Sequence, residues 1–179
     1  MWLLVCGGTA TAYNATNAQI GVGDETVAAA ATQAMLMAVA NKTAWVASTA
    51  YALGAIVRPT AAPTDASVFY YECTTAGTSG TTEPAWPTTD GTTVTDNTAV
   101  WTARLRITYK AMETGYPTSG TLQKAVYKSS FGATEANYIW NEWSVMNGAT
   151  AAKNMNRKVE SLGTKTTGTW TLEVEISLS

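Results

Sequence analysis

The sequence contains no histidine, and this absence removes a large part of enzyme chemistry. Without imidazole the chain cannot build a Ser-His-Asp triad, a Cys-His pair, a His-ligated zinc site or an imidazole acid/base group. Two cysteines are present, Cys6 and Cys73, and they lack the CxxC spacing of metal and redox sites. The sequence predicts two buried thiols or one bridge between them, and it leaves that choice open. We therefore expect no metal and no cofactor.

Charge is also scarce, since 13% of the 179 residues are charged and the formal net charge is -2. The average for soluble domains is about a quarter. The 11 lysines and arginines form no basic patch, so we expect no nucleic acid among the partners. Two explanations of the low charge fit the composition equally well. The surface is polar and rich in threonine, or neighbouring subunits cover part of it.

Long hydrophobic runs are missing as well. The opening apolar run, residues 2–6, is too short for a membrane span or a signal sequence and has no basic residues before it. It predicts a first β-strand, and we expect no membrane partner and no export by this route.

One segment predicts a helix. Residues 27–40 are almost all Ala, Met, Leu, Gln and Val, and Asp24 precedes them as a candidate N-cap. Apolar side chains recur on one face of this expected helix: Val27, Ala31, Met35, Ala38 and Val39. The preceding stretch, residues 14–24, is rich in turn-forming residues around a short apolar pair.

The last third predicts four strands, at 122–131, 137–147, 154–162 and 168–178. In the last strand every second residue from Trp170 is apolar, which is typical of a half-buried antiparallel strand. We expect a four-stranded antiparallel meander covered by the helix, since an apolar sheet face has to be buried. The prediction is an α+β fold, mainly β, with one domain made of residues 1–43 plus 105–179.

Residues 44–104 differ in composition and predict an inserted module. Four of the five prolines fall here, together with three β-like runs at 55–58, 68–73 and 99–102. We expect a small three-stranded β module. The long loop at 74–87 ends with Trp86, which stands between two prolines and is expected to anchor the loop.

The aromatic residues of this module resemble those of the small chitin-binding modules of bacterial chitinases. The matching residues, in order, are Trp45, Tyr51, Gly54, Val57, Tyr71, Gly77, Pro84, Trp86 and Trp101. Where that family has paired exposed tryptophans, this chain has residues 73–75, Cys-Thr-Thr. The resemblance implies contact with polysaccharide through aromatic rings, for which the candidates are Trp86, Tyr70 and Tyr71. Core packing is the expectation for Trp45, Tyr51 and Trp101, and for Trp86 both roles stay open.

The loop 76–87 followed by 90–96 looks like modules that are inserted in structural proteins of tailed bacteriophages. Residues 20–24, 131–143 and 155–159 resemble small virion proteins related to tail-collar and tail-fibre attachment domains. The resemblance implies a virion component, a tail-fibre or tail-adaptor subunit, with the module as a surface insertion that projects toward host surface polysaccharide. It implies binding to other virion proteins and to copies of itself, expected as a homotrimer. A capsid decoration protein is the alternative.

Two further expectations concern particular side chains. Five apolar residues are the candidates for the assembly interface: Met35, Val39, Trp140, Trp143 and Trp170. An enzyme of polysaccharides would have to use carboxylates, and Glu142, between two tryptophans, has the surroundings that raise the pKa of a general acid. The sequence places no second carboxylate beside it, so we expect no enzymatic activity.

Overall fold

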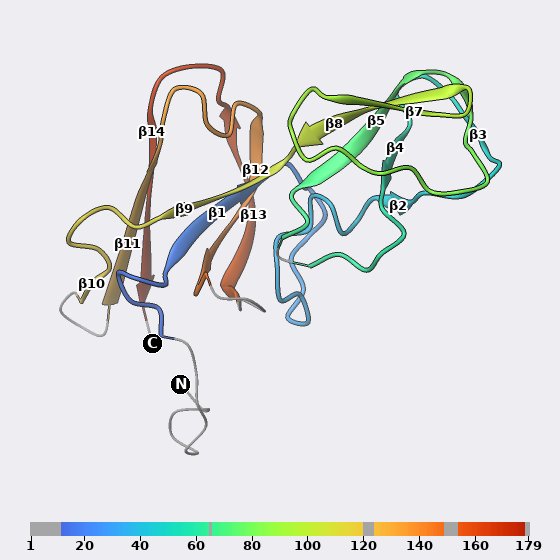
Figure 1. Cartoon of the computed structure of the whole chain (residues 1–179). Helices are drawn as coiled ribbons and strands as arrows, with labels where there is room; N and C mark the ends of the chain where they lie inside the picture. The colour runs from blue at the N-terminus through green and yellow to red at the C-terminus, as the bar shows by residue number, and fades with distance from the viewer. Residues whose placement is uncertain (1–11, 65, 120–123, 149–153, 178–179) are drawn as a thin grey trace.

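The computed structural model describes residues 12–64, 66–119, 124–148 and 154–177, and these ranges contain 14 strands and no helix (Figure 1). The expected α+β class is therefore wrong, because the described chain is all-β. The first expected strand, at residues 2–6, lies outside the described residues. The sheets form two groups, a sandwich and a module, which lie side by side in Figure 1.

The predicted helix at 27–40 is an irregular segment with isolated turns, and Asp24 caps no helix. Besides a few local turn bonds, several of its backbone groups bond to the sandwich. The N–H groups of Met37 and Ala38 donate to the Glu142 carboxylate at 2.8–3.1 Å, and the carbonyl of Val27 accepts from Arg157 at 3.2 Å. Helix propensity differs among residues by only a few tenths of a kcal/mol, so a buried charged group that takes these backbone bonds outweighs it.

Two antiparallel sheets make up the sandwich. The first sheet has the order β13 (Asn154–Thr164), β12 (Ile139–Met146), β1 (Gln19–Gly23) and β9 (Ile107–Ala111). The second has the order β10 (Thr118–Ser119), β11 (Lys124–Phe131) and β14 (Trp170–Ser177). All four strands expected in the last third are present, but the expected meander is wrong. Strand β11 pairs with β14, while β12 pairs with β13 and with β1, so the four strands divide between two sheets.

Strand β1 lies in the middle of its sheet, although its sequence has turn-forming residues. Ile20 and Val22 are fully buried in it. Gly21 is required by a close approach, because a Cβ atom there would lie 2.6 Å from the ring of Tyr109. The glycine that suggested a turn therefore allows the next strand to pack.

The core of the sandwich lies between its two sheets. The ring of Trp140 on β12 packs edge-on against Phe131 and against Trp170, with centroids 4.8 and 5.2 Å apart. Leu172 and Ile176 pack against the same core, as the alternation in β14 predicts.

The module is a five-stranded sheet with a small two-stranded sheet. The order of the larger sheet is β2 (Thr43–Ala44), β4 (Ile56–Arg58), β5 (Phe69–Thr75), β8 (Ala99–Leu105) and β7 (Thr93–Asp96), and β3 (Ala50–Tyr51) pairs with β6 (Gly77–Thr78). The three expected runs correspond to β4, β5 and β8, so the expectation of three strands was too low.

Trp45 and Trp101 are buried in the core of the module, as predicted, and Asp96 accepts both indole N–H groups at 2.8 and 3.0 Å. Tyr51 packs against this core. The Cys73 thiol is free and buried, and Cys6 lies outside the described residues.

Candidate functional site

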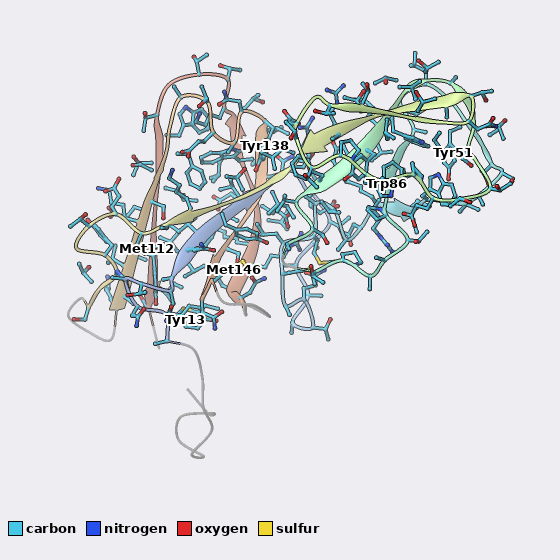
Figure 2. The ribbon with its side chains drawn as sticks, viewed as in Figure 1. Tyr13, Tyr51, Trp86, Met112, Tyr138 and Met146 are labelled. Atoms are coloured by element: carbon cyan, nitrogen blue, oxygen red, sulfur yellow. The ribbon has the colours of Figure 1, made fainter. Side chains whose placement is uncertain are left out.

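A cavity of about 270 Å³ opens beside β5 in the module. Its walls come from Arg58 of β4, from Phe69 and Tyr71 of β5, and from Trp86 and Thr88. The other lining residues are Val39, Pro59, Ala61, Ala62, Pro63, Ala66, Ser67 and Val68. The volume is slightly below the usual range for small-molecule sites, about 300–1,000 Å³. The cavity therefore suits a single small unit rather than a long stretch of polymer. Figure 2 labels Trp86 and Tyr51 within the module.

Trp86 is held in one orientation at this cavity. Its ring stacks on Tyr71 with centroids 4.2 Å apart, and its indole N–H donates to Glu83 at 2.7 Å. The Tyr71 hydroxyl donates to the carbonyl of Pro87 at 3.0 Å, which fixes the end of the loop. Trp86 also approaches Trp101 edge-on at 6.0 Å. The ring thus lies partly against the core and partly in the cavity wall, and its contact with a sugar stays a prediction.

Glu83 joins the two loops that form the cavity. Its carboxylate accepts from the backbone N–H of Thr60 at 2.8 Å and from the Thr60 hydroxyl, as well as from Trp86. Partial burial by itself raises the pKa of Glu83, but the hydrogen bonds from Thr60 and Trp86 outweigh it and lower the pKa overall. The carboxylate is therefore charged at neutral pH and fixes the spacing of the cavity walls.

Arg58, at the end of β4, is a cavity residue that the sequence reasoning missed. Its Nη1 donates to the carbonyls of Pro59 at 2.8 Å and Ala61 at 3.3 Å, while its Nε is buried and has no hydrogen-bond partner. The other three arginines of the chain each lie within 3.3 Å of a carboxylate: Arg104 of Glu72, Arg106 of Asp24 and Arg157 of Glu142. Among the described residues Arg58 has no such partner.

Tyr70 is the sequence-predicted contact residue that lies elsewhere. It is buried on the opposite face of β5 from Tyr71, because successive side chains of a strand alternate. Its hydroxyl donates to Asp24 at 3.2 Å and accepts from Arg106 at 3.1 Å. The guanidinium of Arg106 also lies 5.4 Å from the ring of Tyr70 and 5.8 Å from the ring of Tyr138. Tyr70 therefore joins the module to the sandwich and is not part of the cavity.

Glu142, the carboxylate considered for catalysis, is fully buried, and its oxygens already accept hydrogen bonds from the chain itself. Its side chain is 0% exposed, and its Oε2 accepts from Nε of Arg157 at 2.6 Å. Burial raises the pKa of Glu142, against the opposing effect of the hydrogen bonds from Met37, Arg157 and Ala38. All of these contacts hold the segment 24–42 on the sandwich.

The five candidates for an assembly interface fall into two groups. Val39 and Trp140 are buried in the cores of the chain itself. Met35, Trp143 and Trp170 are partly exposed, and the ammonium group of Lys158 lies 5.8 Å from the ring centroid of Trp143. These three therefore keep apolar surface that a neighbouring subunit could cover.

Comparisons with known proteins place the chain in no group: no family model, no curated protein and no solved structure matches it. In the part of the chain that the structure describes, no cluster of three or more potential metal-binding side chains occurs. The described residues also include no helix that is long and apolar enough to cross a membrane.

Proposed function

We propose that this chain is a non-enzymatic structural subunit of a tailed-phage virion, a tail-fibre or tail-adaptor protein, whose module contacts host glycans. One observation carries the structural role: the three buried carboxylates of the described residues are all used to fix the fold. Glu25 accepts from the N–H groups of Thr26 and Val27, and Asp96 accepts from two indoles and from the N–H of Gly80. Glu142 holds the segment 24–42 in the same way. Groups engaged like this are poorly placed to exchange protons with a substrate.

Assembly with copies of itself is supported by two long edge strands. Within the described residues, β13 pairs only with β12, and β14 pairs only with β11. Such edges carry unpaired backbone groups that can pair with another chain. Partly exposed Trp143 and Trp170 lie on or next to them, on β12 and β14, and contribute apolar surface. We propose a homotrimer.

The virion assignment itself is supported by the resemblance of residues 20–24, 131–143 and 155–159 to tail-associated virion proteins. The glycan contact is supported by the cavity beside Trp86.

Mass spectrometry of purified particles of the phage that encodes the chain tests this proposal. We expect tryptic peptides of the chain in the particles at tens of copies or fewer, and native mass spectrometry of the purified protein should give three copies per assembly. A copy number in the hundreds would replace the tail role by capsid decoration. Particles that lack the chain would refute a virion role.

A further inference from the structure

The cavity beside Trp86 carries an inference about the chemistry of its ligand. We propose that it binds a carboxylate-bearing sugar, such as a uronic acid at a chain end or branch of a polysaccharide, and that Arg58 recognises the carboxylate. The inference rests on the glycan contact proposed above and deepens it by naming the class of sugar.

The first argument is the way Arg58 uses its donors. A guanidinium offers a pair of parallel N–H donors from Nε and Nη2 on one edge, and this pair matches the two oxygens of a carboxylate. Arg58 uses Nη1 for the carbonyls of Pro59 and Ala61, which fixes the plane of the group. Nε is buried without a partner, and no bond from Nη2 is found among the described residues. The edge that suits a carboxylate is therefore the one to which the described residues offer no acceptor.

The second argument is charge. The described residues that line the cavity include Arg58 but no carboxylate. Glu83 is not among the lining residues, and its oxygens accept hydrogen bonds from Thr60 and from the indole of Trp86. The site therefore has one cationic group in mostly apolar surroundings, where an anionic ligand is attracted more strongly than in open water.

The third argument is the rest of the lining. Phe69, Tyr71 and Trp86 supply aromatic surface of the kind that packs against the C–H face of a sugar ring, and Thr88 and Ser67 supply hydroxyl groups. The volume of about 270 Å³ admits one small unit. A terminal or branching uronic acid meets all three conditions, since it joins a carboxylate to a ring with an apolar face.

The test is a titration of the full ¹⁵N-labelled chain, followed by NMR at the Nε–H of Arg58 and the indole N–H of Trp86. The probes are a tetramer of galacturonic acid, its methyl ester, and a short peptide with a free C-terminal carboxylate and an apolar last residue. We expect the galacturonate to shift both signals and to bind at least tenfold more tightly than the ester, because the ester lacks the charge that the guanidinium pairs with. The comparison of acid with ester uses the unaltered protein, so it does not depend on any variant folding.

Arg58→Lys keeps the positive charge but removes the parallel pair of donors, and it should weaken galacturonate binding about tenfold or more. Arg104→Lys is the matched control, because Arg104 pairs with Glu72 on the module surface and does not line the cavity; it should leave binding unchanged.

Equal binding of acid and ester would overturn the acidic class while leaving a glycan contact in place. Tighter binding of the peptide would replace the sugar by a peptide terminus. No shift with any probe would overturn both the inference and the glycan contact, whereas the virion role is decided separately by the particle analysis.

Discussion

The buried pair of Glu142 and Arg157 provides the sharpest test of how the sandwich holds the segment 24–42. We predict that Glu142→Gln strongly destabilises the protein. The Gln carbonyl oxygen can still accept from the N–H groups of Met37 and Ala38, which Oε1 of Glu142 accepts at 3.0 and 2.8 Å. Its amide nitrogen, however, would face Nε of Arg157, where Oε2 now accepts at 2.6 Å. Two donors would then meet, and the guanidinium would lose its anion.

The expected magnitude follows from burial. The side chains of Arg157 and Glu142 are 2% and 0% exposed. Removing one partner of a buried ion pair costs about 3–5 kcal/mol, because the other charge stays out of water without compensation. For a chain of this length about 2–4 °C of melting temperature correspond to each kcal/mol, so Tm should fall by about 6–20 °C. The double variant Glu142→Gln/Arg157→Met removes the stranded charge and should recover at least about 1 kcal/mol relative to Glu142→Gln alone.

Urea unfolding and hydrogen exchange measure both parts of this prediction. The amides of Met37 and Ala38 should exchange faster in Glu142→Gln than in the unaltered protein. Glu72→Gln is the matched control, since the pair of Glu72 and Arg104 is about one-third exposed and is expected to contribute about 0–1 kcal/mol. If Glu142→Gln cost no more than this control, or if the double variant were the least stable of the set, the reasoning would be refuted.

Two further predictions concern the module. Asp96→Ala leaves the buried indole N–H groups of Trp45 and Trp101 without an acceptor and should cost roughly 2–6 kcal/mol at about 1–3 kcal/mol for each donor; a loss below about 1 kcal/mol in urea unfolding would contradict this. Because the pKa of Glu83 is lowered in the fold, its contribution to stability is complete above the ordinary value of 4.5 and is lost as pH falls through the lower folded value. The indole N–H signal of Trp86 should therefore titrate with a midpoint below 4.5, and Glu83→Gln should abolish the titration; a midpoint above 4.5 would show that the bonds to Glu83 do not stabilise its charge.

Alternation of apolar residues predicted the strands well but not their partners. The register of Trp170 on β14 follows from a period of two, which is a local property. Which strand lies beside β14 depends on contacts with β11, about 45 positions earlier, and alternation carries no information on that choice. The meander was the shortest connection, and the chain instead divides the four strands between two sheets.

The prediction of a helix at 27–40 was wrong for a different reason. Its prediction rested on intrinsic propensity, which is small, while the structure is decided by a carboxylate more than 100 positions away. In the candidate site, Trp86 and Tyr71 could be found from the aromatic pattern, but Tyr70 could not be separated from Tyr71 without knowing which face of β5 each occupies.

The sequence around Arg58 contains few carboxylates. No acidic residue occurs between positions 44 and 64, and the next one, Asp65, lies outside the described residues. A partner could still have come from elsewhere in the fold, as Glu142 does for the backbone of Met37. That Arg58 has no carboxylate partner among the described residues is therefore seen only in the folded module.

A single residue, Arg106, separates β8 of the module from β9 of the sandwich. Its side chain forms an ion pair with Asp24 at 3.3 Å and donates a hydrogen bond to the Tyr70 hydroxyl. A connection this short, whose side chain is bonded to both parts, allows little of the relative motion of module and sandwich that a flexible linker would permit. In an assembly of several copies, the cavities would then stand at set distances from one another. Avidity would depend on whether the spacing of ligands on a surface matches those distances, since a rigid array cannot adjust to a spacing that does not fit.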